Sequence, residues 1–198
     1  MKKRWMVLGG IILLAMVLII VRRITENESI NPTLTIETPQ KLSASETDTF
    51  VLDVSVSALG EALYPAASMS ISFDSSCLEF LGIEEGNVFV LGETNAAGAA
   101  RQLPEWSYNS EQSNKTGLIN IMYLDLTGGK HAFSKELLTE ENHVVLRLRF
   151  CLRGSARVGD VYDLILEDAV FAASDESKSL AMTMKTLKTK NSRVVIGE

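Results

Sequence analysis

Residues 69–89, "MSISFDSSCLEFLGIEEGNVF", give the clearest indication of the architecture. Large apolar residues alternate with serines up to Phe73, which is the pattern of a strand that buries one face. The Asp-Ser-Ser run at 74–76 predicts a corner, because such short polar side chains hydrogen-bond the nearby backbone. The chain then becomes apolar again until Gly86, which frees the backbone for another turn. Two short strands joined by a tight corner are typical of an all-β protein.

The same alternation recurs along the rest of the chain. In "DTFVLDVSVSA" (48–58) and "HVVLRLRFCLR" (143–153), every second residue is large and apolar. Many short strands between Gly, Asn and Ser turns predict two packed sheets, an all-β sandwich. The predicted strands are 33–37, 48–58, 66–73, 77–83, 105–109, 117–125, 143–153, 161–171, 180–187 and 193–196, and the one predicted helix is 134–142, begun by Ser134.

Three segments, in this order, resemble the cohesin family. "SISFDSSCLEFLGIEEGNVF" is similar to its aromatic-Asp-x-x-x-Leu-Glu pattern and the acidic-Gly turn that follows. "TGLINIMYLDLTGG" (116–129) resembles its apolar strand before a Gly-rich loop, and residues 144–174 resemble its long strand, Ala-x-x-Gly turn and next strand. A further segment, "ETDTFVLDVSVS", matches a strand that cohesins usually open with Gly-Asp-Thr, with Thr47 where the glycine is common.

The resemblance covers residues 33–197 and implies a fold and a function. Cohesins are jelly-roll β-sandwich modules of cellulosome scaffolds, related in fold to some carbohydrate-binding modules, and they bind dockerin domains. In the family, the dockerin packs on the outward face of one sheet. That face includes the strand before the Asp corner and the strand before the Gly-rich loop. The implied partner-binding residues are Ala66, Ser68, Ser70, Ser72, Asn120, Met122, Leu124 and Asp125.

The match at this face is incomplete. Well-studied cohesins of the first type carry an Asn and an Asp where this chain has Ala66 and Ser68, so those hydrogen bonds are missing. Met122 matches an apolar contact position of the family, and Asp125 matches an acidic one. The resemblance therefore implies a partner that is not a standard dockerin.

The strand 117–125 is unusual without any reference to a family. Met122 and Leu124 lie on the face opposite Ile121 and Tyr123, so large apolar side chains occupy both faces. A solvent-facing strand has little reason to be apolar, so we expect something to cover its outward side. Two covers remain open, which are the loop 126–142 and a protein partner.

The first 23 residues, "MKKRWMVLGGIILLAMVLIIVRR", predict a membrane anchor. The uncharged run 5–21 has 17 residues and would span about 26 Å as a helix, the short end of a membrane span. The basic cluster before it places the tip, 1–4, in the cytoplasm. A cleaved signal peptide is the alternative, but no small-x-small cleavage site follows the run. The sequence thus predicts a single-pass anchor, a linker at 24–32 and an extracellular domain at 33–197.

The charge beyond residue 23 limits the class of partner. Five of the 19 Lys and Arg residues precede that point, which leaves 14 basic against 25 acidic residues, a formal charge of −11. We therefore expect no nucleic-acid partner. No cofactor is predicted. Cys77 and Cys151 favour two free thiols, although a disulfide in an oxidising compartment stays open.

Two surface patterns have competing interpretations. In 143–153, Arg147, Arg149 and Arg153 alternate with core residues, and pairing with carboxylates on neighbouring strands is favoured over an acidic-partner site. Trp106 and Tyr108 lie at strand spacing, the minimum for an aromatic strip against sugar rings. A pair of core aromatics is the favoured interpretation of these two residues.

Enzymatic chemistry finds little support. His131 and His143 are the only histidines, so neither a His-rich metal site nor a Ser-His-Asp set is easy to build. Asn114-Lys115-Thr116 is formally a glycosylation sequon. A glycosidase pair would have to come from the acids Glu79, Glu84, Glu85, Asp125 and Asp168, and sequence alone does not bring two of them across a cleft.

The predicted function is therefore non-catalytic. The chain is expected to be a membrane-tethered extracellular module, similar to a cohesin, that holds a dockerin-bearing or other secreted protein at the cell surface. Two alternatives remain. One is a polysaccharide-binding module of the same jelly-roll fold, and the other is a cohesin-like structural or assembly module without a dockerin partner.

Overall fold

The structure is a computed structural model. It describes residues 31–37, 42–43, 49–95, 98–154, 156–180, 182–183 and 186–197. The predicted cytoplasmic tip, the anchor and most of the linker lie outside these ranges. Within them, no helix combines the length and the apolar character needed to cross a bilayer.

The described residues form mainly β-strands. The strands are β1 (Thr33–Ile36), β2 (Leu42–Ser43), β3 (Phe50–Val56), β4 (Ala66–Phe73), β5 (Leu78–Glu85), β6 (Val90–Asn95), β7 (Gly98–Gln102), β8 (Leu118–Leu124), β9 (Val144–Leu152), β10 (Val161–Ala172), β11 (Lys188–Lys190) and β12 (Ser192–Gly197). The helical segments are the α-helix α2 (Ser110–Thr116) and the 3-10 turns η1 (Lys135–Leu137) and η2 (Glu176–Lys178).

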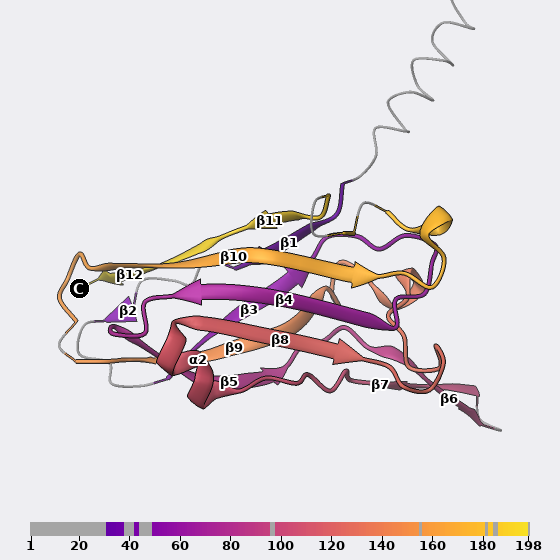
Figure 1. Ribbon diagram of the computed structural model, residues 1–198, viewed down its shortest axis with the longest axis horizontal. Coiled ribbons are helices and arrows are strands. Elements are labelled where there is room, and N and C mark those ends of the chain that lie inside the picture. Colours follow the sequence, from indigo (N-terminus) through magenta and orange to yellow (C-terminus); the bar gives the residue numbers. More distant parts are fainter. Residues whose placement is uncertain are drawn as a thin grey trace, which may run out of the picture. The chain divides into compact units, whose positions relative to one another are not determined.

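Two sheets carry most of these strands. The first sheet has the order β11-β1-β3-β9-β5 and the second has the order β2-β12-β10-β4-β8. Figure 1 looks onto β10, β4 and β8 of the second sheet, with β3 and β9 of the first sheet fainter behind them. The hairpin β6–β7 pairs only with itself and extends beyond the end of the sheets. The predicted all-β sandwich is confirmed at this level.

The core lies between the two sheets because the central strands bury alternate side chains. The burial of β4 alternates strictly between half-buried and buried, and β8 alternates between exposed and buried. Aromatic rings fill one end of the core, with Phe150 lying 5.5 Å from Phe73 and 5.4 Å from Phe80 between ring centroids. Each such side chain contributes about 2 kcal/mol through its burial.

The corner at 74–76 carries the chain from one sheet to the other. It follows β4 of the second sheet and precedes β5 of the first. The Asp74 carboxylate accepts the backbone N–H of Ser76 at 2.9 Å and also its hydroxyl, while the Asp74 carbonyl accepts the N–H of Leu78 at 2.9 Å. The hydrogen bonds from the side chain and backbone of Ser76 lower the pKa of Asp74. The sequence motif is therefore a crossover between layers.

Gly86 ends β5 for a reason of space. A Cβ atom at this position would lie 2.1 Å from the carbonyl oxygen of Val144 and 2.6 Å from the carbonyl carbon of Val145. The neighbouring Asn87 and Val88 both donate their backbone N–H to the Val144 carbonyl, at 2.7 and 3.0 Å. Only glycine permits this close approach of the turn to the start of β9.

Some predicted elements are wrong. Residues 105–109 form no strand, since only Ser107 bridges to Met122. The predicted helix 134–142 is reduced to the single turn η1, where Leu137 is buried and Leu138 packs partly buried against the core. The described residues of 180–187 form turns, and the strand begins later as β11, which runs parallel to β1.

The α-helix occurs instead at α2, which the sequence analysis missed. The segment "SEQSNKT" is polar throughout, so it shows no apolar periodicity. Its ends define it. The Asn109 side chain accepts the N–H of Gln112 at 2.9 Å, and Gly117 closes the helix in the left-handed conformation at φ 70°. The hairpin β6–β7 was also missed.

Candidate binding face

Seven of the eight predicted site residues share one face of the second sheet. The antiparallel register of β4 and β8 sets Ala66 opposite Leu124, Ser68 opposite Met122 and Ser70 opposite Asn120. The neighbours that point the other way are buried, which turns the even-numbered residues of both strands outward. Ser72 continues the row on β4, opposite Leu118. We call these outward residues, together with those that β10 adds next to them, the binding face.

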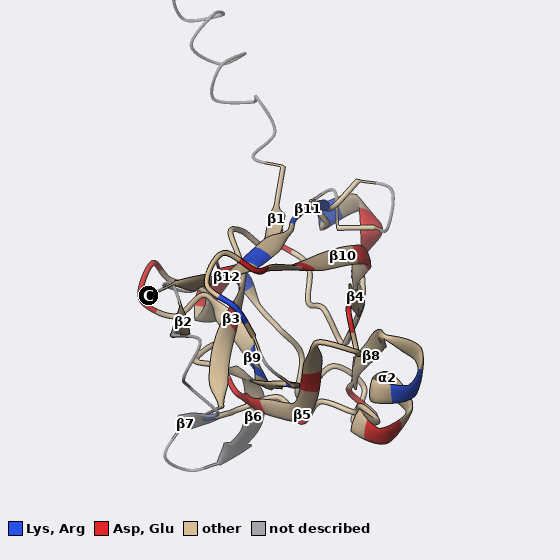
Figure 2. Ribbon diagram, turned by 90° about the vertical axis from the view of Figure 1, so that its left-hand side faces the viewer, with Lys and Arg blue, Asp and Glu red and all other residues tan. Residues whose placement is uncertain are grey.

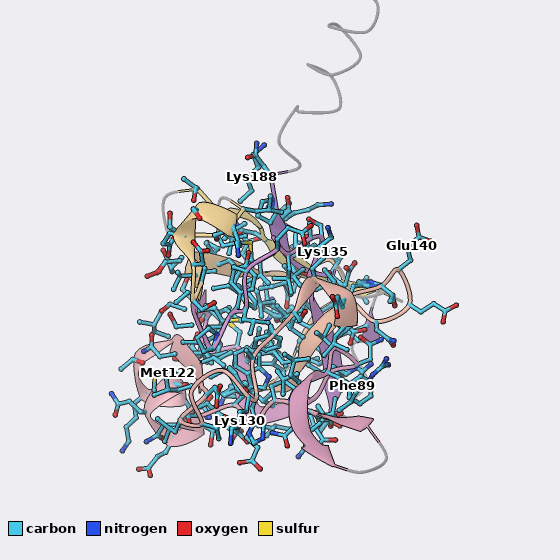
Figure 3. All side chains as sticks on the ribbon, turned by 90° about the vertical axis from the view of Figure 1, so that its right-hand side faces the viewer. Phe89, Met122, Lys130, Lys135, Glu140 and Lys188 are labelled. Atoms are coloured by element: carbon cyan, nitrogen blue, oxygen red, sulfur yellow. The ribbon has the colours of Figure 1, made fainter. Side chains whose placement is uncertain are left out.

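The binding face has a low floor and an apolar ridge. Its floor is β4, whose outward side chains are one alanine and three serines, all of them half-buried. Met122 and Leu124 form the ridge on β8, with 51% and 54% of their surface exposed. Figure 3 shows Met122 at the periphery of the domain, away from the crowded interior. Neither β4 nor β8 carries a charged residue.

Strand β10 contributes a third row that the sequence analysis did not assign to the site. Its register sets Asp168 opposite Ser70, Val170 opposite Ser68 and Ala172 opposite Ala66. A bulge between Leu166 and Asp168 shifts the register, which brings Asp168 outward. Acidic residues therefore mark β10, as the red segments of Figure 2 show.

The polar groups at the centre of the face are hydrogen-bonded to each other. The Ser70 hydroxyl donates to the Asn120 side-chain oxygen at 2.8 Å, and the Ser72 hydroxyl donates to a Glu167 carboxylate oxygen at 2.6 Å. These bonds join three strands across their outward side. The apolar side chains Met122 and Leu124 of β8 are then the part of the face that none of the described segments covers.

The loop after β8 does not cover the ridge. Its Phe133 is fully buried and lies 5.0 Å from Tyr123 between ring centroids, so the loop packs into the end of the core. Tyr64 and Phe133 hold it there through a β-bridge. Leu126, at the start of the loop, is itself 86% exposed. The loop-cover interpretation is therefore wrong, because Met122 and Leu124 remain open to solvent.

Asp125 organises the loop that begins beside the face. Its carboxylate accepts the backbone N–H groups of Thr127 and Gly129 at 2.7 Å and that of His131 at 3.2 Å. Burial by itself would raise the pKa of Asp125, but the hydrogen bonds from Thr127, His131 and Gly129 outweigh it and lower the pKa. The predicted acidic contact is thus bound to its own turn.

Tyr123 supports the same turn from the core side. Its hydroxyl donates to the carbonyl of His131. Burial, followed by the negative charges of Asp125 and Glu105, raises the pKa of Tyr123 to about 12. The inward and outward residues of β8 therefore have different tasks. Tyr123 holds the loop, while Met122 and Leu124 face solvent.

The edge strands β8 of the second sheet and β5 of the first sheet both have hydrogen-bonding partners on their outer sides. Ser107 exchanges two backbone hydrogen bonds with Met122, at 2.8 and 3.0 Å, on the free side of β8. The side chain of Asn114, on α2, pairs with the backbone of β5. It accepts the Phe80 N–H at 2.8 Å and donates to the Phe80 carbonyl at 2.9 Å. The sequon asparagine is thus a structural side chain. A partner strand finds no open ladder at these positions.

The aromatic pair does not form a sugar-binding strip. Trp106 packs against Tyr123 and Phe133 and donates its indole N–H to the carbonyl of Val145 at 3.2 Å. Tyr108 lies instead against Phe80, with 5.8 Å between ring centroids. The two rings contact different parts of the core, so the favoured core interpretation is confirmed for Trp106.

The arginines of β9 pair as expected. Arg147 binds Asp53 of β3 at 2.9 Å, and Arg149 binds Glu84 of β5 at 3.5 Å. Arg153 binds Glu79 at 3.5 Å. The outer side of the first sheet therefore satisfies its own charges, and two of the acids considered for a glycosidase pair are bound to arginines.

Cys77 and Cys151 are both free thiols. Cys151 lies opposite Glu79, while the carbonyl of Cys77 accepts the N–H of Arg153. The cysteines are thus diagonal neighbours, for which Cα atoms about 7–8 Å apart are typical, beyond the usual reach of a disulfide. In the described part of the chain, no cluster of three or more His, Cys, Asp or Glu residues has the geometry to hold a metal ion.

Comparison with solved structures shows what the fold is similar to. No family model and no curated protein matches the chain. Among solved structures, the third cohesin of ScaC from Acetivibrio cellulolyticus, in complex with the ScaB dockerin, aligns with a TM-score of 0.60 at 12% identity, over 84% of this chain and 99% of the cohesin. The sixth cohesin of scaffoldin B from the same organism, in complex with a Cel5 dockerin mutant, gives 0.59 at 18% identity, with the same coverage.

A third similar structure is of a different cohesin type. The type III cohesin module of the cell-surface anchoring scaffoldin ScaE from Ruminococcus flavefaciens aligns with a TM-score of 0.56 at 16% identity, over 88% of this chain and 91% of the module. The described part of the chain thus has a cohesin-like fold, as the sequence resemblance predicted.

Proposed function

We propose that this chain is a non-catalytic binding module that holds a dockerin-bearing or other secreted protein at the cell surface. One observation carries the proposal. Met122 and Leu124 are half-exposed on an uncharged pair of strands, and no described segment packs on them. Covering such side chains stabilises a complex by about 25 cal/mol for each Å² of apolar surface buried. A protein surface is the cover that fits.

The cohesins that align with this chain support the type of partner. The two from Acetivibrio cellulolyticus that are described above are in complex with dockerins. The floor of the binding face here consists of Ala66 and three serines, and the hydroxyls of Ser70 and Ser72 already bond within the sheet, so it offers few free hydrogen-bonding groups to a partner. We therefore propose a dockerin-like partner that gains its affinity mainly from apolar contact with β8.

The cellular location is part of the proposal. Residues 5–21 anchor the chain in the cell membrane as a single span, and the module from residue 33 onward faces outward. An anchored chain remains with the membranes after carbonate washing and is released by detergent. Recovery of the chain mainly from the medium, with an N-terminus beyond Arg23, would show a cleaved signal peptide instead.

Capture from culture supernatant tests the binding function. The full-length chain, immobilised through its C-terminus, is compared with its Met122→Asp and Val51→Asp variants. Val51 is the matched control, because it is exposed (39%) on the outer side of the first sheet. We expect the wild type and Val51→Asp to retain the same secreted protein and Met122→Asp to lose it. Retention by all three chains would contradict the proposal.

The identity of the retained protein decides between the alternatives. A dockerin in its sequence supports the cohesin-like function, and a protein without one supports an assembly module of another kind. Polysaccharide binding predicts retention on insoluble polysaccharide. No geometry at Trp106 favours it, since that ring is packed in the core.

A further inference from the structure

The acids of β10 differ from the other acids on the sheets. Asp53, Glu79 and Glu84 of the first sheet each pair with an arginine of β9, and Asp163 pairs with Arg193 at 2.8 Å. Glu167 and Asp168 have no ion pair with any Lys or Arg that the structure describes. Glu167 is oriented only by the Ser72 hydroxyl. The bulge turns Asp168 outward opposite Ser70, and both acids lie on the β10 flank of the binding face.

The acids and the apolar ridge lie on opposite flanks of the binding face, with β4 between them. Asp168 and Met122 lie two strands apart and in adjacent outward rows. Strands are spaced by about 4.8 Å, so the lateral separation of β10 and β8 is about 10 Å. This width is close to the diameter of one α-helix with its side chains. A helix lying on the small residues of β4 would have the ridge on one flank and the acids on the other.

The occupied edge of β8 favours the same geometry. Ser107 takes hydrogen-bonding positions beside β8, the edge strand of this sheet, so a partner approaches the face with side chains and not as an added strand. Negative charge on one flank is complemented by Lys or Arg. The face carries no basic residue on β4, β8 or β10 to compete for them.

We propose that Glu167 and Asp168 are specificity-determining residues that bind Lys or Arg on one flank of a partner helix, whose apolar stripe packs on Met122 and Leu124. The proposal rests on the proposed function and names the chemistry of the partner. The acids replace, from β10, the polar contacts that β4 lacks at Ala66 and Ser68.

Two synthetic helical peptides test the proposal. Both have the same leucine stripe, and they differ only in an Arg-rich or a Glu-rich flank. Their binding to the full-length chain, immobilised through its C-terminus, is measured by biolayer interferometry at about 0.15 M salt. We expect the Arg-flanked peptide to bind at least ten-fold more tightly. The double variant Glu167→Gln/Asp168→Asn should reduce this preference to less than about three-fold.

The matched control separates a specific site from the general negative charge of the domain. Glu140→Gln/Glu141→Gln makes the same change of charge, and Figure 3 shows Glu140 projecting into solvent well apart from Met122. This control should keep the full preference. A gain-of-function variant, Glu167→Lys/Asp168→Lys, should reverse the preference in favour of the Glu-flanked peptide.

Several results would overturn the assignment. They are failure of the Arg-flanked peptide to bind, equal binding of both peptides, a preference that survives the double variant, and a preference that falls as far in the control. None of these results bears on the capture experiment, because the variants compared there leave Glu167 and Asp168 unchanged. The specificity proposal can therefore fail while the proposed function stands.

Discussion

The outer faces of the two sheets are built by the same alternation of side chains along their strands, but they differ in whether their outward side chains find partners within the domain. On the first sheet, outward arginines of β9 pair with carboxylates on β3 and β5, so this side completes its interactions within the domain. On the second sheet, β4 and β8 carry no charge, and no segment that the structure describes packs on Met122 and Leu124. Outward side chains that pair within the domain contribute to folding, whereas exposed apolar side chains without such contacts are available to bind a partner.

The largest expected effect separates two adjacent residues of β8. Ile121→Asp places a charge in the core, where the isoleucine is 2% exposed, and should cost more than about 4 kcal/mol of unfolding free energy. Met122→Asp, one residue along and outward, should change it by less than about 0.5 kcal/mol. Urea denaturation of both variants measures the difference. A similar loss in both would mean that Met122 is covered.

The next effect concerns the first sheet. Arg147→Ala removes an ion pair to Asp53 and a hydrogen bond to the carbonyl of Glu85 at 2.7 Å. Because the pair is about one-third exposed, the expected loss of stability is about 1 kcal/mol, or roughly 2–4 °C in the melting temperature. Binding of the captured partner should not change. A binding defect without a loss of stability would mean that the interface lies on the first sheet and not on the second.

A smaller effect concerns the corner that joins the two sheets. The pKa of Asp74 is lowered in the folded chain, so its carboxylate stabilises the fold above the unfolded pKa of about 3.8, and this contribution is lost as the pH falls through the lower folded value. Asp74→Asn should therefore destabilise the domain at pH 7, and the difference from wild type should shrink below about pH 4. Thermal melts at both pH values test this. A difference independent of pH would exclude the carboxylate charge as its cause.

The smallest effect is spectroscopic and concerns the inward side of β8. Tyr123, with a pKa of about 12, should remain protonated after exposed tyrosines ionise near pH 10. Its neutral form is favoured in the fold, so this contribution is present below pH 10 and is lost as the pH rises through about 12. Ultraviolet titration of wild type against Tyr123→Phe detects the late step. Ionisation of all tyrosines near pH 10 would contradict the buried hydrogen bond.

The sequence predicted the strands that form the body of the sandwich. In β3, β4, β8 and β9, burial of alternate residues follows directly from the side-chain period of a strand. The same period correctly assigned Met122 and Leu124 to the outward side. It did not predict α2, because a short polar helix is defined by Asn109 and Gly117 at its ends and not by apolar spacing. Those end residues were the available signal.

The part of the face on β10 could not be read from alternation. Leu164 and Leu166 predict one parity, and Ala169 and Phe171 have the other, because a bulge intervenes. That break in the apolar pattern was the signal for the bulge. The position of the loop after β8 also depended on tertiary contacts, since Phe133 enters the core beside Tyr123.

One measurement tests the central claim most directly. The affinity of the captured partner and the thermal stability are determined on the same preparations of wild type, Met122→Asp and Val51→Asp. A desolvated apolar centre carries most of the energy of an interface, so Met122→Asp should weaken binding by about 2 kcal/mol or more, roughly thirty-fold, with an unchanged melting temperature. Val51→Asp should bind as the wild type does. A folded Met122→Asp chain that binds at full strength would contradict the assignment of this face.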